Sequence, residues 1–343
     1  MKSVLVIRLS AMGDVAMTIP VLYSVARQHP DVHFTLLTRD RFTRLLLNAP
    51  GNVDTIGIDP DQYHGLKGLS RLYKQLKEHR FDAVADLHDV LRSKYLRLRF
   101  ALNSDVKVRH IHKGRWQKRR LTARCCKHRG QLPSSFYRYA EVFRRLGFQT
   151  EERFESVFDQ STPDYAALPE QFRQKPDGQR WIGIAPFAKF AGKIYPIDMM
   201  EQIIDRLIQQ DDVRMFLFGF GKEESDILER FASKSDHIVS CAGRFSPSQE
   251  LILMSLLDVM LSMDSANMHL ASLVGTRVVS LWGATHPWAG FMGWKQSTHD
   301  AIGVSLDCRP CSVFGNKPCR RKDEACMRQI RPEDVVRRLL KQD

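Results

Sequence analysis

Two aspartates carry the chemistry that this sequence offers, because each follows a predicted strand and stands at the start of a predicted helix. Residues 264–269 (Asp-Ser-Ala-Asn-Met-His) come after an apolar run at 256–263 and open a short apolar helix. A helix start offers N–H groups and the positive end of the helix dipole, which bind phosphate. Asp264 is therefore expected to face a phosphate-carrying ligand, with His269 one turn along the same helix. The alternative is that Asp264 or Ser265 only caps the helix.

The second aspartate lies near the amino terminus. An apolar run at residues 4–9 leads into a turn with Gly13 and Asp14, and residues 15–27 have a helical pattern. Both aspartates are thus predicted at the carboxyl end of a parallel strand, where open α/β sheets bind ligands. The turn lacks the G-x-G-x-x-G dinucleotide fingerprint, and a carboxylate there suits a general base that takes a proton from a hydroxyl. Helix capping by Asp14 explains the turn equally well.

Five short motifs follow one another along nearly the whole chain. They are residues 7–14 (IRLSAMGD), 183–186 (GIAP) with 193–196 (KIYP), 264–269 (DSANMH), 282–287 (WGATHP) and 308–311 (CRPC). Together they resemble the bacterial heptosyltransferases of glycosyltransferase family 9, which build the inner core of lipopolysaccharide. The resemblance implies an α/β protein of GT-B architecture, with two Rossmann-like parallel-sheet domains that face each other across a cleft.

The elements that must position these motifs alternate between strand and helix in both halves of the chain. Strands are predicted at residues 4–9, 33–37, 55–58, 83–87, 106–109, 181–185, 213–218, 237–241, 256–263 and 278–282. This alternation predicts parallel sheets with helices on both faces. A polar stretch at 161–180, punctuated by proline and glycine, indicates a linker. We therefore expect a Rossmann-like acceptor-binding domain at 1–160 and a Rossmann-like nucleotide-sugar domain at 181–343, the latter with a cysteine-containing tail and a terminal helix.

The resemblance also implies a reaction: inverting, metal-independent transfer of a heptose from ADP-heptose to a lipopolysaccharide inner-core acceptor. It implies that Asp14 is the catalytic base and that no cofactor is required. The donor-binding residues that it implies are Lys189, Lys193, Glu223, Phe245, Asp264, Ser265, Ala266 and His269. Glu224 leaves the register of the ribose-binding glutamate open. Ala266 stands where the family commonly has glycine, so a methyl group lies where the backbone approaches the ligand.

The net charge of +13 is concentrated in one part of the chain. No acidic residue stands between Asp105 and Glu141, although eleven lysines and arginines do. Such a run attracts nucleic acid, an anionic membrane surface or a phosphorylated glycolipid, whereas the plainer alternative is a solvated loop. Between Lys107 and Arg129 only Trp116 offers a stacking ring, so nucleic acid is the poorer partner.

In view of the family, the expected partner is an anionic glycolipid acceptor (lipopolysaccharide core with lipid A) at the cytoplasmic surface of the inner membrane. The candidate acceptor-binding residues are His88, Arg92, Arg115, Lys118, Arg119 and Arg120. No apolar run approaches the roughly 18 residues of a membrane span, and no signal peptide precedes the first strand. We therefore expect a cytoplasmic protein that associates peripherally with the inner membrane.

Four cysteines near the carboxyl terminus form the pattern C-x2-C-x7-C-x6-C: Cys308, Cys311, Cys319 and Cys326. Four thiols with a leading C-x2-C could bind structural zinc, although the second pair lacks the usual short spacing. Plain thiols or a labile disulfide are the alternatives, and no metal is assigned to the reaction itself. Two other functional classes stay open: another nucleotide-sugar enzyme on this scaffold (a different donor, or an epimerase), and a non-catalytic binder of anionic glycan or nucleic acid.

Overall fold

The computed structural model describes residues 1–341, which divide into two compact units by their contacts. The first unit comprises Met1–Lys113 and Ser135–Ser161, and the second comprises Gly114–Ser134 and the chain from Thr162 onward. Each unit is built on its own parallel sheet, so the predicted class of two Rossmann-like α/β domains is confirmed. The exchange of Gly114–Ser134 was not predicted, because the sequence shows no boundary on either side of that segment.

The first unit has its strands in the order β3-β2-β1-β4-β5, all parallel. They are β1 (Ser3–Ile7), β2 (His33–Arg39), β3 (Val53–Ile58), β4 (Ala83–Asp86) and β5 (Lys107–His110). From β1 the chain moves outward to β2 and β3, and from β4 it moves the other way to β5. The order therefore reverses between β1 and β4, and ligands of open α/β sheets bind at such a switch point.

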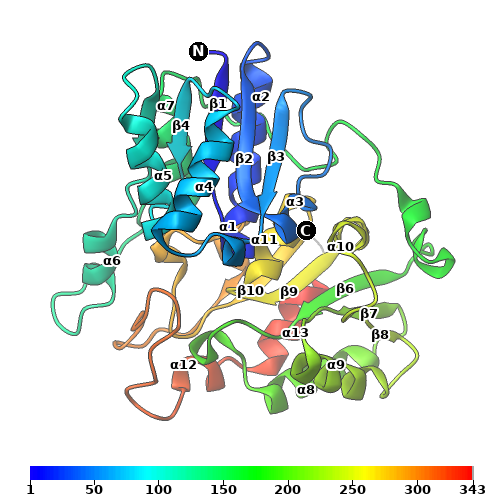
Figure 1. Ribbon diagram of the computed structural model, residues 1–343. Coiled ribbons are helices and arrows are strands. Elements are labelled where there is room, and N and C mark those ends of the chain that lie inside the picture. Colours follow the sequence, from blue (N-terminus) through cyan, green and yellow to red (C-terminus); the bar gives the residue numbers. More distant parts are fainter. Residues whose placement is uncertain (342–343) are drawn as a thin grey trace. The chain divides into compact units, whose positions relative to one another are not determined.

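Helices cover both faces of this sheet (Figure 1). On one face lie α4 (Gly65–Lys77) and α5 (Leu91–Ala101), which pack against each other and bury Leu72, Leu96 and Phe100 with the strand residues. On the other face α2 (Thr18–Gln28) packs against α7 (Ser135–Arg144). The short helix α3 (Asp40–Thr43) follows β2.

The helix predicted at residues 15–27 is divided in two. The structure has α1 (Met12–Ala16) and α2, separated at Met17. Pro20 explains the break, because it has no N–H to donate to the carbonyl of Ala16 and its ring crowds that carbonyl. The break leaves Asp14 in the first turn of a one-turn helix at the end of β1.

The second unit has a six-stranded parallel sheet in the order β11-β10-β9-β6-β7-β8. The strands are β6 (Arg180–Ala185), β7 (Val213–Leu217), β8 (Ile238–Ser240), β9 (Val259–Met263), β10 (Arg277–Leu281) and β11 (Ala301–Ile302). Its main helices are α8 (Ile197–Ile208), α9 (Lys222–Ala232), α10 (Pro247–Met254), α11 (Ala266–Leu273) and α13 (Pro332–Leu340). Here the strand order reverses between β6 and β9, which is the second switch point.

Two segments differ from their predicted state. The middle of the basic run forms a helix, α6 (Arg115–Leu121), whose last residue, Leu121, is buried against Leu132 and Ala289 of the second unit. The predicted linker at 161–180 also packs on the second unit, where the ring of Phe172 lies edge-on to Phe216 at 5.5 Å between centroids. No helix among residues 1–341 combines the length and apolar character needed to cross a membrane.

Candidate functional site

Asp14 lies at the switch point of the first unit, in the first turn of α1 after β1. Its Oδ2 accepts a hydrogen bond from the N–H of Ala11 at 3.1 Å and stands 2.7 Å from Nη2 of Arg8. The capping contact expected from the sequence is therefore present. It does not exclude a second role, because about a third of the Asp14 side chain (32%) is exposed to solvent.

Arg8, which was not predicted as a site residue, holds this carboxylate in place. The residue is 5% exposed, its Nη1 donates to the carbonyl of Leu87 at 2.6 Å, and its guanidinium lies over the ring of Tyr139 at 5.6 Å. A buried arginine needs a compensating anion, and Asp14 supplies it. The signal in the sequence was an arginine inside an otherwise apolar strand run.

His88 follows β4 and lies beside the end of β1. Its Nδ1 accepts from the N–H of Leu9 at 3.4 Å, and its Nε2 is 3.4 Å from Oγ of Ser10. Burial lowers the pKa of His88 to about 3, and the nearby charges of Arg8 and Lys113 act in the same direction. The imidazole is therefore neutral near pH 7.

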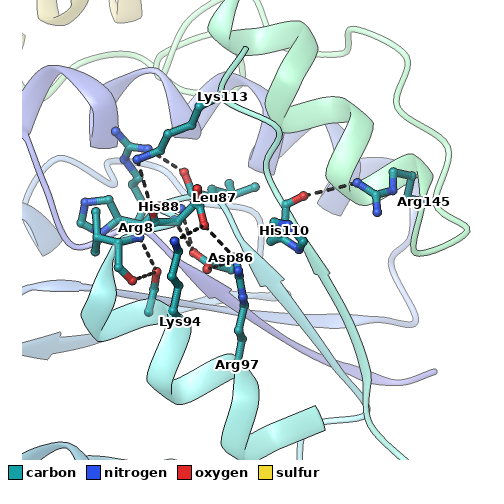
Figure 2. Close-up of polar contacts among 12 residues, drawn as sticks. Arg8, Asp86, Leu87, His88, Lys94, Arg97, His110, Lys113 and Arg145 are labelled. Atoms are coloured by element: carbon teal, nitrogen blue, oxygen red, sulfur yellow. Dashed lines mark hydrogen bonds and ion pairs between the residues drawn. The ribbon is translucent and has the colours of Figure 1, made fainter. Parts of the chain in front are cut away.

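Hydrogen bonds to the side chain of Asp86 hold the loop that carries His88 (Figure 2). The buried carboxylate of Asp86 accepts from the N–H groups of His88 and Asp89 at 2.9 Å each, and it pairs with Nη1 of Arg97 at 3.1 Å. Arg92 lies in the first turn of α5 and donates to the carbonyl of Pro60 at 3.0 Å. The structure thus brings Asp14 and His88 to one switch point, with Arg92 in the first turn of the helix that follows His88.

Replacing His88 with asparagine should make stability less sensitive to acid. The folded pKa of about 3 lies below the ordinary value of 6.5, so the unfolded chain binds more protons between these values and stability falls as pH drops through that window. Between pH 7 and 5.5 the wild type should lose about 1 kcal/mol more unfolding free energy than His88→Asn. Urea unfolding at both pH values measures the difference, with the exposed His299→Asn as control. Equal losses in wild type and His88→Asn would mean that His88 is not buried in its neutral form.

Asp264 lies at the switch point of the second unit, directly after β9. Lys193, in the 3₁₀ turn Ala191–Lys193 that follows β6, places its Nζ 2.8 Å from Oδ2 of Asp264. The lysine approaches outside the direction of a regular hydrogen bond, so the contact is an ion pair. Both side chains are largely buried, with 15% and 4% exposed. Two predicted donor residues from distant parts of the sequence are therefore in contact.

The helix start after Asp264 is not capped by its neighbour. Ser265 occupies the N-cap position of α11 with an extended backbone, but its hydroxyl makes no capping hydrogen bond and lies 3.2 Å from Oγ of Ser262. Ser265 and Ala266 are partly exposed, whereas His269, one turn along, is 6% exposed. Ser265 is therefore the N-cap residue by position, but its side chain does not cap the helix.

The remaining predicted donor residues follow the carboxyl ends of other strands in the same sheet. Glu224 accepts from the N–H of Phe220 at 2.8 Å, which leaves Glu223 exposed and settles which glutamate faces solvent. Phe245 is partly buried, with its ring edge-on to Phe172 at 6.2 Å. Lys189 is exposed and lies over the ring of Phe190 at 5.5 Å.

The family described as "Glycosyltransferase family 9 (heptosyltransferase)" matches residues 69–320. The chain belongs to glycosyltransferase family 9. Lipopolysaccharide core heptosyltransferase OpsX of Haemophilus influenzae is 26% identical over 294 residues, which cover 83% of this chain and 80% of OpsX. Lipopolysaccharide heptosyltransferase 1 of Pseudomonas aeruginosa is 22% identical, and the match covers 98% of this chain and 96% of that protein.

Two solved glycosyltransferase structures share the fold of this transferase. The Escherichia coli heptosyltransferase WaaC with ADP superimposes with a TM-score of 0.67 at 17% identity, and 98% of each chain is covered. The family 9 glycosyltransferase of Veillonella parvula DSM 2008 gives a TM-score of 0.72 at 16% identity, covering 99% of this chain and 98% of that one.

The four carboxyl-terminal cysteines of the transferase line one cavity of about 370 Å³. Cys308, Cys311, Cys319 and Cys326 are all free thiols, and burial raises the pKa of Cys326 to about 11. Among residues 1–341 no three histidine, cysteine or acidic side chains are grouped to hold a metal ion.

The loop that bears these cysteines supports Lys193 instead. Gly315 has φ +74°, and a Cβ on it would lie 2.6 Å from Cγ of Lys193. The carbonyl of Gly192 accepts from the N–H of Ala284 at 2.9 Å, and Ala284 in turn accepts from the N–H of Cys311 at 3.0 Å. The position of the lysine thus depends on close backbone packing in this loop.

Gly315→Ala in this transferase should raise the donor KM at least fivefold, because the added methyl group displaces Lys193. The matched control is Gly178→Ala, since Gly178 has a similar φ of +75° but nothing within 4 Å of an added Cβ. Both variants carry the backbone cost of alanine at positive φ, about 1 kcal/mol. Steady-state kinetics with varied donor distinguish them, and equal KM changes in both would show that Lys193 has not been displaced.

Proposed function

We propose that this family 9 glycosyltransferase moves a heptose from ADP-heptose to a lipopolysaccharide inner-core acceptor, with inversion at the anomeric carbon and without a metal ion. The observation that carries the proposal is the Lys193–Asp264 pair beside the uncapped start of α11. A lysine and a helix start provide positive charge for a diphosphate. The names of the relatives OpsX and heptosyltransferase 1 support the sugar, and WaaC with ADP supports the nucleotide.

The chemistry follows from charge. Asp14 removes the proton from an acceptor hydroxyl, and that oxygen attacks the anomeric carbon on the face opposite the ADP. The bond between this carbon and the ADP oxygen breaks, and its electron pair stays on the diphosphate. Lys193 and the N–H groups at the start of α11 stabilise the negative charge that develops, which is the task a metal performs in other transferases.

The other donor contacts complete the proposal. Glu223 binds the ribose, Phe245 packs against the adenine, and Lys189 assists at the diphosphate. Ser265 and Ala266 present backbone N–H groups, while Asp264 and His269 contact the heptose and diphosphate. In this assignment the second unit holds the donor, and the first unit holds the acceptor through Asp14, His88 and Arg92.

The basic run attracts the anionic acceptor, with Arg115, Lys118, Arg119 and Arg120 on or near the surface of α6. This helix belongs to the second unit, whereas Lys107, Arg109, Lys113 and Arg138 of the same run belong to the first. The enzyme acts at the cytoplasmic surface of the inner membrane, where both substrates meet.

Binding of ADP, UDP and GDP, measured by calorimetry in EDTA, tests the donor. We expect ADP to bind at least tenfold more tightly than the other two, and transfer from ADP-heptose to heptose-free core glycolipid to run at full rate in EDTA. Mass analysis of the product gives the added sugar, and NMR gives its anomeric configuration. Preference for UDP or GDP, or a strict need for added Mg²⁺ or Mn²⁺, would contradict the proposal.

A further inference from the structure

The helices α4 and α5 of the first unit expose an unusual set of large apolar side chains. The two helices lie next to each other on one face of the sheet, with Leu72, Leu96 and Phe100 among the residues turned into the core (Figure 1). Four leucines, which we call the leucine surface, are turned outward: Leu66 (73% exposed), Leu91 (86%), Leu98 (62%) and Leu102 (76%). Grouped exposure of this kind is typical of an interaction surface.

The spacing on α5 places three of these leucines in one stripe. With about 3.6 residues per turn, positions seven and eleven residues apart lie on the same side of a helix. Leu91, Leu98 and Leu102 have these spacings, and Leu102 is the C-cap residue of α5. Leu66 stands in the first turn of α4, and Leu91 in the first turn of α5, so the stripe begins near the carboxyl edge of the sheet.

Positive charge surrounds the leucine surface. Neither α4 nor α5 contains an acidic residue, whereas together they contain Lys67, Arg71, Lys74, Lys77, Arg92, Lys94, Arg97 and Arg99. Some of this charge is neutralised, since Arg97 pairs with Asp86 and Asp89 at 3.1 Å each. Lys67, Lys74 and Lys77 are exposed on α4.

We propose that the leucine surface inserts into an anionic phospholipid bilayer, the one that carries the acceptor. A layer with an apolar interior and anionic headgroups is complementary to exposed leucines among lysines. The position of Leu91 also agrees with a membrane-bound acceptor. Leu91 lies in the sequence between His88 and Arg92, which are the two acceptor-binding candidates of this unit. A second copy of the chain is a poorer occupant, because it would bring the same positive charges together. The link to the acceptor rests on the proposed function, but the binding of lipid does not.

Cosedimentation with vesicles tests the proposal on the full-length protein. The vesicles are pure phosphatidylcholine, or phosphatidylcholine with 30% phosphatidylglycerol. The test variant is Leu91→Ser, Leu98→Ser and Leu102→Ser combined. The charge variant combines Lys67→Ser, Lys74→Ser and Lys77→Ser. The control is Tyr137→Ser on α7, since Tyr137 is also exposed (54%) but belongs to the helix layer on the other face of the sheet.

We expect wild type to bind the anionic vesicles at least tenfold better than the neutral ones. The triple leucine variant should lose at least tenfold, the charge variant should lose the preference for anionic lipid, and Tyr137→Ser should stay within twofold. The triple leucine variant should also raise the KM for acceptor embedded in vesicles about tenfold, with no change for the delipidated core oligosaccharide.

Unchanged vesicle binding by the triple leucine variant would overturn the proposal. So would light scattering that shows a wild-type dimer and a monomeric leucine variant, because the surface would then join two copies. Vesicle binding needs neither donor nor acceptor. The vesicle experiment therefore tests this proposal even if the proposed reaction is wrong. Conversely, transfer to the soluble oligosaccharide measures the reaction without the bilayer. Circular dichroism and urea unfolding confirm that each variant is folded.

Discussion

Asp14→Asn is expected to lower kcat at least 100-fold while leaving the affinity for ADP within about threefold, because a general base contributes about 10²–10⁴-fold. Asparagine keeps the shape of the side chain and can still accept from the N–H of Ala11, but it cannot take a proton. ADP binding is unaffected because the proposed nucleotide contacts all lie in the second unit. Single-turnover kinetics and ADP titration on the same preparation give both values.

Asp40→Asn is the matched control for this substitution. Asp40 also follows a strand of the same sheet and opens a helix, α3, but it is exposed and makes no contact with Arg8. Loss of the charge on Asp14 also leaves Arg8 buried without its anion, so unfolding by urea must be measured in parallel. Retention of more than about a tenth of the wild-type kcat would remove Asp14 from the role of base.

The sequence predicted the strands well because the central strands of a parallel sheet are buried on both faces and form continuous apolar runs. Every predicted strand is present with ends within three residues. The largest offset is at the start of β9, where the apolar pair at residues 256–257 packs before the strand begins. There Asp258 accepts from the N–H of Trp181 at 2.7 Å and marks the true edge. The two-residue strand β11 has no such run and was missed.

The candidate site was predictable in position but not in its pairings. Asp14 and Asp264 could be placed because each follows a strand, and position along a parallel strand determines the edge of the sheet. That Arg8 would hold Asp14 depends on the exact path of the turn between β1 and α1. That Lys193 would meet Asp264 depends on β6 and β9 being neighbours in the second sheet. Strand order is a property of the whole fold, which local patterns do not contain.

The sequence also could not predict that α6 belongs to the second unit, because this too depends on the whole fold. Charge dominates residues 115–121, and the small apolar cluster of Leu121 with Leu132 and Ala289 decides where the helix packs. The exposure of the leucines on α5 could not be predicted from the sequence either. An alternating pattern of leucine and arginine is compatible with either an inward or an outward stripe until Leu96 and Phe100 are known to face the core.

Lys193→Met should reduce kcat/KM on the order of 10²–10³-fold, because it removes a positive charge from the departing diphosphate. The same change should destabilise the protein by about 3 kcal/mol, since it leaves the carboxylate of Asp264, 4% exposed, without its partner. Adding Asp264→Asn removes the unpaired charge, so the double variant should recover most of the stability. Activity should not return, because no positive charge has been restored.

Urea unfolding and steady-state kinetics of Lys193→Met, Asp264→Asn and the double variant separate the structural effect of the ion pair from its chemical effect. The matched control is Lys175→Met. Its partner is Asp258 at 2.6 Å, at the amino end of β9, and that pair is more exposed, with 30% and 41% of the side chains accessible. This control should cost under about 1 kcal/mol and leave kinetics unchanged. If the double variant regained both stability and activity, Lys193 would serve only to neutralise Asp264, and the charge on the departing diphosphate would have to be stabilised by other groups at the start of α11.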